Sequence, residues 1–288
     1  MKILICADIH GNFQALQALL KTKCAKTADK IYILGDLVTM GPEPNKVIDT
    51  IKNNPKIHSI MGNHDKWVAI EPPPSSINAK RIKIKHHEYM KSMISDDNLE
   101  YLRNLPYYEE IFFGNKKFYL THYGWKNNFC EVIEHPDVVE NKDNIKDIFP
   151  NIDADCIFFG HNHDPLEFEC GSQQYVCVGT LGMSKYGMYI VLTLNEDGGY
   201  IIERKTLRIQ VYKTIKIMRQ LKYPRYNLYI GYLLGKFSSI YQAENTDDKL
   251  ARENQPVKLL FKSSHEELSK LTSLKYKQRK NMNNSQKK

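Results

Sequence analysis

The sequence lacks the signatures of several protein classes. Its six cysteines form no C-x-x-C pair, and we interpret them as small buried hydrophobic residues. No apolar run approaches the ~20 residues that a membrane-spanning helix needs. The first apolar run begins at residue 2, which leaves no room for the segments of a secretory leader. Together these absences predict a reducing, cytoplasmic setting. The cysteines are Cys6, Cys24, Cys130, Cys156, Cys170 and Cys177.

Charge is distributed unevenly along the 288 residues. Residues 206–288 hold 18 Lys and Arg against 6 Asp and Glu, a balance of +12, which leaves −4 for residues 1–205. A basic end can bind nucleic acid, an anionic membrane or an acidic partner, although a solvated face is the commoner outcome. The 42% apolar content is enough to fill a core, so we expect a globular enzyme-like part followed by a basic end.

Apolar runs alternate with segments of helical spacing. Apolar residues share one helix face at 13–20 and again at 47–51, the second time after a break at Pro42-Glu43-Pro44-Asn45. Alternating strands and helices predict a layered α/β fold with parallel strand pairing. Strand-like runs return at 166–170, 175–178, 188–194 and 200–207, with Gly198-Gly199 as a hairpin turn.

Two polar segments interrupt this alternation. Residues 71–110 predict a helical insertion, and residues 126–150 predict a second, partly helical one. Loops beyond strand ends carry most binding contacts, so we expect both segments near the site. Adjacent helix residues point about 100° apart. We therefore interpret His86 and His87 as solvent-exposed histidines rather than as a ligand pair.

The C-terminal part begins with a helical pattern. Residues 211–240 predict helices that close a domain spanning 1–240, and an apolar face on them either packs on that domain or binds a membrane surface or partner. Residues 241–288 predict a basic, partly disordered extension, because they are rich in lysine and asparagine.

Five short apolar runs each end at side chains that bind metals. An uninterrupted apolar run is typical of a buried strand, and ligands of open α/β sheets lie beyond the carboxyl ends of strands. We therefore expect the following side chains to converge at one edge. The runs 3–7, 31–34, 57–61, 118–120 and 157–159 precede, in turn, Asp8 and His10, then Asp36, Asn63, His122, and finally His161 with His163.

These ligand types predict a dinuclear centre. Carboxylate, imidazole and amide groups suit Mn, Fe or Zn rather than a thiolate-dependent site. One ion rarely uses seven such groups. Two ions about 3.5–4 Å apart, sharing a carboxylate and a bridging hydroxide, would use them all and would suit in-line attack on phosphorus.

The motifs also resemble those of a known family. D-x-H-G-N at 8–12, G-D at 35–36, G-N-H-D at 62–65, H at 122 and G-H-x-H at 160–163 occur in the order found in calcineurin-like metallophosphoesterases. Segments 35–42 and 98–106 resemble the small bacterial branch, and the resemblance covers about residues 1–237. It implies a four-layer α/β/β/α sandwich of two mixed sheets, with the helical insertion as a lid. Periodicity alone indicates only layered α/β.

The resemblance also implies which residues hold which ion. Asp8, His10 and His163 would bind one metal. Asn63, His122 and His161 would bind the other, and Asp36 would bridge the two.

His64 is the remaining imidazole of the motifs. In the family, the equivalent histidine donates a proton to the leaving oxygen or stabilises its charge, and the resemblance implies that Asp65 orients the ring. Imidazole is also the side chain that titrates near neutral pH, as such an acid should.

Asn12, Asn63 and Thr180 are the residues expected near the phosphate, although Asn12 could equally form a turn. Thr180 lies in a loop where Cys177 and Val178 depart from the family's Asn-Pro.

The sequence therefore predicts a cytoplasmic hydrolase of phosphomonoesters, in which a metal-bridging hydroxide attacks and His64 acts as acid. The phosphomonoester could be a phosphoprotein, a nucleotide or a small-molecule phosphate. A phosphodiesterase or dinucleoside polyphosphate hydrolase is the alternative. A binding scaffold on the same fold is disfavoured because every ligand is retained. The basic extension could direct the enzyme to an anionic partner.

Overall fold

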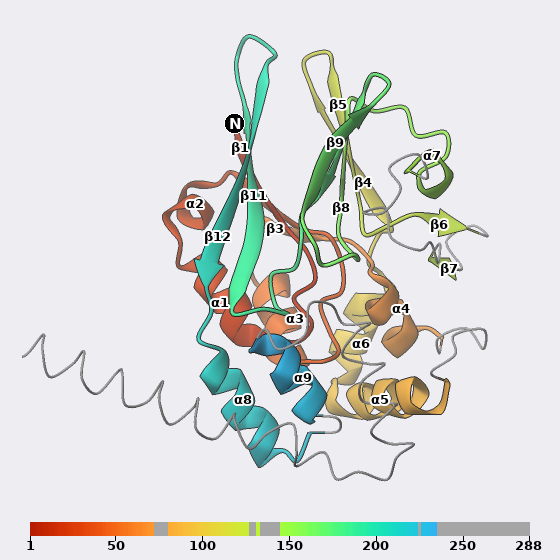
Figure 1. Ribbon diagram of the computed structural model, residues 1–288, viewed down its shortest axis with the longest axis vertical. Helices are drawn as coiled ribbons and strands as arrows, with labels where there is room; N and C mark the ends of the chain where they lie inside the picture. The colour runs from red at the N-terminus through yellow and green to blue at the C-terminus, as the bar shows by residue number, and fades with distance from the viewer. Residues whose placement is uncertain (72–79, 127–130, 133–144, 224–225, 235–288) are drawn as a thin grey trace, which may run out of the picture.

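The chain folds into two five-stranded sheets packed face to face (Figure 1). This structure is a computed structural model, and it describes residues 1–71, 80–126, 131–132, 145–223 and 226–234. The first sheet has the strand order β12-β11-β1-β2-β3 and the second the order β4-β5-β8-β10-β9. Each sheet contains both parallel and antiparallel pairs.

The first sheet is built on a parallel core of three strands. They are β1 (Lys2–Cys6), β2 (Lys30–Ile33) and β3 (Ile57–Ser59). Two longer strands extend the sheet in antiparallel pairing, β11 (Tyr186–Leu194) and β12 (Tyr200–Arg208). The predicted turn between them is confirmed, since Gly198 has a φ of +83° and its N–H donates to Asn195 O.

The second sheet also has a parallel core. Its centre is β5 (Lys116–Thr121), β8 (Cys156–Phe159) and β10 (Gln173–Cys177), and its antiparallel edges are β4 (Tyr108–Phe113) and β9 (Leu166–Cys170). A separate two-stranded ribbon joins β6 (Trp125–Lys126) to β7 (Glu131–Val132).

Helices cover the outer faces of the sheets, most of them at the first. Figure 1 shows α4, α5, α6, α8 and α9 gathered at one end of the molecule, away from the β11–β12 turn. The helices are α1 (Phe13–Leu20), α2 (Lys23–Thr27), α3 (Pro44–Lys52), α4 (Asn63–Ala69), α5 (Lys80–Met93), α6 (Asp96–Arg103), α7 (Ile145–Ile148), α8 (Val211–Gln220) and α9 (Tyr226–Leu233).

The apolar core has separate layers on the two faces of each sheet, because alternate strand residues point to opposite faces. Ile3 and Ile5 of β1 face the second sheet, while Leu4 and Cys6 face the helices. Alternate strand residues point to opposite faces, so a strand buried on both sides reads as a continuous apolar run. On the far side of the second sheet, a smaller cluster packs around α7.

The fold expected from the sequence is confirmed, with differences in detail. Two mixed sheets flanked by helices form the sandwich, and α3 begins at Pro44 as predicted. The predicted insertion 71–110 holds α5 and α6, but Tyr108 to Glu110 already belong to β4. Within 126–150 the described residues form two short strands and α7. The basic extension, the boundary near residue 240 and Cys130 lie outside the described residues.

The described cysteines are free thiols, and Cys6, Cys156 and Cys177 are buried as predicted, whereas Cys24 and Cys170 are only partly buried. Among the described helices, none combines the length and the apolar character needed to cross a membrane.

Candidate metal centre

The seven predicted ligands lie beyond the carboxyl ends of five strands. Asp8, Asp36 and Asn63 follow the parallel strands β1, β2 and β3, and His122 and His161 follow the parallel pair β5 and β8. Because the two sheets pack face to face, both sets of strand ends meet at one edge. The expectation that these side chains converge is borne out by the distances between them.

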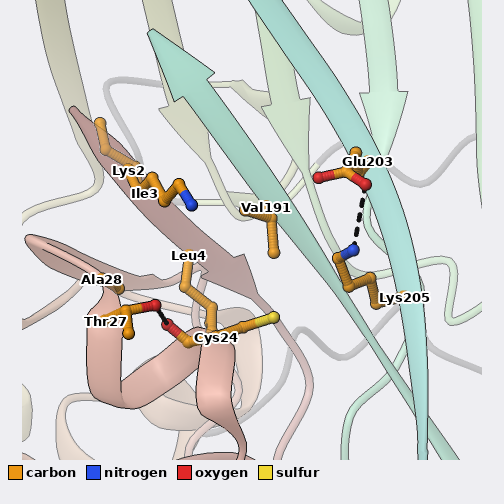
Figure 2. Close-up of a pocket in the computed structure, with 9 residues that line it drawn as sticks. All are labelled: Lys2, Ile3, Leu4, Cys24, Thr27, Ala28, Val191, Glu203 and Lys205. Carbon is orange, nitrogen blue, oxygen red and sulfur yellow. Dashed lines mark hydrogen bonds and ion pairs between the residues drawn. The ribbon is translucent and has the colours of Figure 1, made fainter.

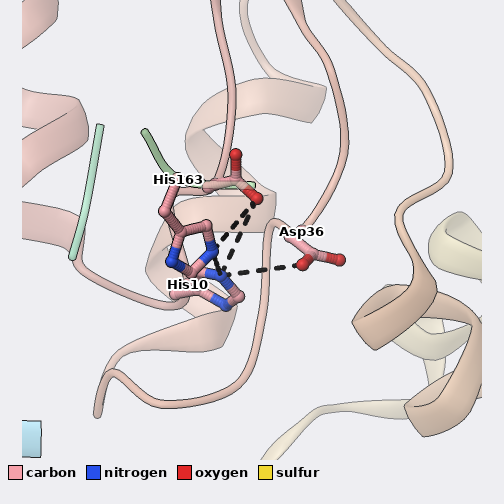
Figure 3. A group of neighbouring side chains, drawn as sticks. His10, Asp36 and His163 are labelled. Atoms are coloured by element: carbon pink, nitrogen blue, oxygen red, sulfur yellow. Dashed lines mark hydrogen bonds and ion pairs between the residues drawn. The ribbon is translucent and has the colours of Figure 1, made fainter. Parts of the chain in front are cut away.

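The first group of ligands surrounds the imidazole of His10 (Figure 3). Its Nε2 lies 3.0 Å from Nε2 of His163 and 3.6 Å from Oδ2 of Asp36. Asp8 completes the group, with Oδ1 at 3.4 Å from Nε2 of His163. One ligand atom from each of these four residues lies within 4.8 Å of the others, and all four residues are buried.

The second group is centred on the amide of Asn63. Its Oδ1 lies 2.9 Å from Nε2 of His122 and 2.9 Å from Nδ1 of His161. Oδ2 of Asp36 lies 3.5 Å from Nε2 of His122. The same Asp36 oxygen therefore faces one imidazole of each group, which is the position that a bridging carboxylate requires.

The donor atoms of the second group suit a cation. Nδ1 of His122 lies 2.7 Å from Leu34 O, and a carbonyl oxygen can only accept, so Nδ1 carries the proton. Burial lowers the pKa of His122, which keeps the ring neutral and leaves Nε2 with a lone pair. That lone pair faces Asn63 Oδ1, another acceptor. Two acceptors turned toward one another are the arrangement expected of ligands to a shared positive ion.

The first group leads to the same conclusion from its charges. Burial first, and then the charges of Asp8 and Asp65, raise the pKa of Asp36 well above its ordinary value. Burial also holds the pKa of His10 well below its usual range. Oδ1 of Asp8 is buried and accepts no hydrogen bond within the described part of the chain. Divalent ions would neutralise these crowded carboxylates and use the neutral imidazoles, so the residues fit a dinuclear metal centre.

His163 is the imidazole of the first group that carries positive charge most readily. Burial alone would lower the pKa of His163, but the neighbouring Asp8 carboxylate raises it. Burial likewise opposes ionisation of Asp8, yet His163 and the other imidazoles outweigh it and bring the pKa of Asp8 to about 2.

The backbone at the ligands is strained. Five of the seven ligands have a positive φ, a region that few residues other than glycine adopt: Asp8, His10, Asp36, His161 and His163. Such conformations cost about 1–3 kcal/mol each and cluster at functional sites. Close packing supports them. A Cβ on Gly62 would lie 2.2 Å from the backbone nitrogen of Asp36, so only glycine allows α4 to begin against that carboxylate.

His64 lies beside the first group without belonging to it. Its ring meets that of His10 edge to face, with centroids 5.2 Å apart. The backbone N–H of His64 donates to Oδ1 of Asp36. The orienting role expected of Asp65 stays a prediction. Its oxygens accept from the backbone amides of Gly62, Leu37 and Val38, which fixes the start of α4 against the Asp36 loop. Burial raises the pKa of Asp65 to about 6.

Asn12 and Thr180 are held by the protein itself. Asn12 caps α1 through Ala15 N, donates to Gly182 O and accepts from Thr214 of α8. The hydroxyl of Thr180 donates to Asp8 O and accepts from Met183 N. Both side chains are at most 3% exposed. They shape the loops that carry the ligands, and contact with phosphate stays a prediction for each.

Two further side chains lie at or beside the centre. Tyr123 is buried and its ring lies over that of His161, with centroids 4.6 Å apart. His87 reaches His64, with Nε2 3.1 Å from its Nδ1. The expected exposure of His86 and His87 is wrong, since each is only 4% exposed. Their perpendicular rings agree with the helix geometry. The apolar contacts that bury them come from distant elements, so no local signal marks them.

A hollow elsewhere on the molecule does not involve the ligands. Figure 2 shows it between β1, α2 and β12, lined by residues such as Lys2, Cys24 and Lys205. It lies at the beginning of β1, whereas Asp8 follows its end. No candidate ligand contributes to its lining.

Comparison with known proteins agrees with the geometry. A sequence profile described as calcineurin-like phosphoesterase matches residues 1–165. An uncharacterized protein of Methanocaldococcus jannaschii is 32% identical over 167 residues, which are 57% of this chain and 63% of that protein. A symmetrical bis(5'-nucleosyl)-tetraphosphatase of Photorhabdus laumondii is 29% identical over 126 residues, 43% of this chain and 44% of that enzyme. The matched stretch thus spans less than two thirds of either relative.

Solved structures share the fold. A protein of Pyrococcus horikoshii superposes with a TM-score of 0.65 at 21% identity, covering 78% of this chain and 94% of that one. A metallophosphoesterase of Sphaerobacter thermophilus superposes with a TM-score of 0.58 at 22% identity, covering 78% and 95%. At these identities the likeness concerns the fold alone.

Proposed function

Because the chain belongs to the calcineurin-like phosphoesterase family, we propose that it is a metal-dependent phosphoric ester hydrolase acting on a phosphomonoester. A phosphoprotein, a nucleotide and a small-molecule phosphate all present the same terminal group. The observation that carries this proposal is the position of Asp36 Oδ2, 3.6 Å from His10 Nε2 and 3.5 Å from His122 Nε2. One carboxylate oxygen between two ligand groups is the layout that in-line displacement at phosphorus uses.

Each ligand has a place in this proposal. Asp8, His10 and His163 would hold one divalent ion, Asn63, His122 and His161 the other, and Asp36 both. Two ions, Mn, Fe or Zn, would supply positive charge for the phosphoryl oxygens and acidify an attacking water. Thr39 Oγ1, 3.2 Å from Nδ1 of His10, and Leu34 O, beside Nδ1 of His122, orient the rings so that each presents Nε2.

His64 is the catalytic acid of the proposal. As the P–O ester bond breaks, an N–H of its ring would donate to the leaving oxygen and stabilise the charge that develops there, since this oxygen would otherwise depart as a free alkoxide. The edge contact with His10 places the ring at the ligands, and Oδ1 of Asp36 fixes its backbone. General acids of this kind contribute about 10²–10⁴-fold to rate.

A dinucleoside polyphosphate is the second candidate substrate. The relative from Photorhabdus laumondii is named for symmetrical cleavage of bis(5'-nucleosyl) tetraphosphate. The ligand arrangement would serve an anhydride as well as an ester, because both present a phosphoryl group to the ions that these residues would hold. A phosphodiesterase activity would use the same residues.

Activity profiling of the reconstituted protein tests the proposal. The protein is stripped of metal, loaded separately with Mn²⁺, Fe²⁺ or Zn²⁺, and assayed on p-nitrophenyl phosphate, bis-p-nitrophenyl phosphate, nucleoside monophosphates, a phosphopeptide and diadenosine tetraphosphate. Fastest turnover of a monoester supports the leading proposal, and fastest cleavage of the tetraphosphate supports the second. Absence of hydrolysis of every compound by protein with bound metal would overturn both.

A further inference from the structure

Helix α5 carries two adjacent buried histidines that face different neighbours. His86 lies among Tyr223 and Tyr229 of the C-terminal segment, with ring centroids 5.7 and 5.3 Å away, and Met40 N–H donates to its Nε2. The rings of His86 and His87 are nearly perpendicular, at 82°. His86 thus anchors the helix, and His87 is turned toward α4.

His87 is packed closely on the proposed acid. Its ring is nearly parallel to that of His64, at 14°, with centroids 5.2 Å apart. Trp67, one turn further along α4, meets both rings edge to face, 5.0 Å from His64 and 5.5 Å from His87. Nε2 of His87 lies 3.1 Å from Nδ1 of His64. These distances place the two nitrogens between the ring centres, as a hydrogen bond between nearly coplanar rings requires.

We propose that His87 is a positioning residue that sets the tautomer of His64, its Nε2–H donating to Nδ1 of His64. Only one of the two facing nitrogens can carry the proton. If Nδ1 of His64 accepts, the neutral ring keeps its proton on Nε2, from which it would donate a hydrogen bond to the charge that develops on the leaving oxygen. If Nδ1 donated, Nε2 of the neutral ring would have no proton to offer. This inference rests on the proposed role of His64.

Asp65, the other group expected to orient His64, accepts hydrogen bonds from the backbone. Three backbone amides donate to its carboxylate, and it is fully buried in the first turn of α4. The orienting group at Nδ1 is instead an imidazole supplied by the insertion. A partner that selects a tautomer affects rate through the residue it orients, without touching the substrate.

The first test varies the basicity of the leaving group. A matched alkyl and aryl pair is taken from the ester class that the wild type hydrolyses, since an alkoxide needs the hydrogen-bond donor and p-nitrophenolate needs it much less. His87→Phe keeps an aromatic ring but removes the nitrogen. We expect it to lower kcat for the alkyl ester about 10–100-fold and for the aryl ester only a few-fold, with KM little changed.

Two further variants separate the hydrogen bond from packing. His87→Gln keeps an N–H at a similar reach and should restore most of the rate. His64→Ala should show the same leaving-group pattern, and adding His87→Phe to it should cause no further loss. Equal losses on both esters, or a full additional loss in the double variant, would show a merely structural role and overturn the inference.

The second test needs no activity. In the metal-free protein, the ¹⁵N resonances of the His64 ring are assigned by comparison with His64→Gln, at a pH where the ring is neutral. We expect Nε2 to carry the proton in the wild type and a mixture of tautomers in His87→Phe. His58→Phe is the matched control, because the His58 ring stacks on Tyr32 of β2 and should leave the His64 signals unchanged. A proton found on Nδ1 of His64 in the wild type would contradict the inference.

The proposed function and the inference about His87 would be contradicted by different results. A metal-loaded wild type that hydrolyses no phosphoester contradicts the proposed function. A wild type that is active and impaired by His64→Ala, but unaffected by His87→Phe, leaves the function intact and removes His87 from it.

Discussion

The strand-end loops and helix α5 both bring imidazoles to the same centre, but they hold them differently. In the loops, five ligands have positive φ, and glycines such as Gly62 pack against them with no space for a Cβ. Helix α5 is regular, and side-chain contacts with Tyr223, Tyr229 and Met40 fix its position. The backbone thus sets the ligand positions, while an inserted helix supplies a group that acts on the neighbouring His64.

This difference predicts that loop variants lose metal and insertion variants keep it. The largest effect should come from Asp36→Ala, because its Oδ2 faces both ligand groups. We expect metal content to fall from two ions toward none and hydrolysis to fall to the detection limit. Elemental analysis of the purified variant measures this. Asp29→Ala, which removes a carboxylate that accepts from Lys2 N, is the matched control and should keep both ions.

His64→Ala should have the next largest effect. We expect kcat to fall about 10²–10⁴-fold, because the leaving oxygen loses its acid. Both ions should remain bound, since His64 lies outside the two ligand groups. Steady-state kinetics and elemental analysis on one preparation test both parts. Wild-type rates on every ester would remove His64 from the mechanism, and loss of metal would mean that it is a ligand.

A smaller effect should follow from loosening the contact between the C-terminal segment and α5. The Tyr223 hydroxyl, fully buried, donates to Gly41 O and contacts the sulfur of Met90. Tyr223→Phe should lower the free energy of unfolding by about 1 kcal/mol, because Gly41 O loses its partner. Urea denaturation measures it. Tyr212→Phe, which alters an exposed hydroxyl, should change stability by much less. An unchanged midpoint for Tyr223→Phe would contradict this prediction.

The smallest effect concerns an ion pair in the second sheet, far from either region. A hydrogen bond from the Lys116 ammonium, and then one from Lys117 N, hold the pKa of Asp155 below its ordinary value. A lowered carboxylate pKa stabilises the fold above the unfolded-state value, near 3.9. That stability is lost as the pH falls through the lower folded-state pKa.

Asp155→Asn should therefore be less stable than the wild type at pH 7, by no more than about 1 kcal/mol because both side chains are partly exposed. The difference should shrink as the pH falls from 5 toward 3, and urea midpoints at a series of pH values would show it. A difference that stays constant across this range would mean that packing, rather than charge, is responsible.

The candidate metal ligands could be placed from sequence because each lies within four residues of a strand end. An apolar run, a strand end and a polar side chain are all local properties, and parallel pairing then brings the ends together. Asp36 as the bridging residue follows from family order, and its two nearly equal distances support it. The geometry of Asn12, held by Thr214 some two hundred residues later, could not be read locally.

The histidines of α5 also show that local sequence does not reveal contacts with distant segments. Helix spacing correctly predicted that His86 and His87 point apart. It could not predict what lies on each side, because Tyr223 and His64 reach them from different parts of the chain. The predicted exposure of His86 and His87 was wrong because the sequence of a polar helix does not show which other elements pack against it.

By itself the sequence determined the α/β alternation, the strand ends and the choice of the seven candidate ligands, since these depend on residue types within a few positions of each other. Only the tertiary structure decided which oxygen of Asp36 faces both ligand groups, that Asp65 is used by backbone amides, and that His87 rather than Asp65 meets His64. Those outcomes depend on packing between elements distant in sequence. The spacing of apolar residues shows which face of a helix is apolar, but only the tertiary fold determines which elements pack on that face.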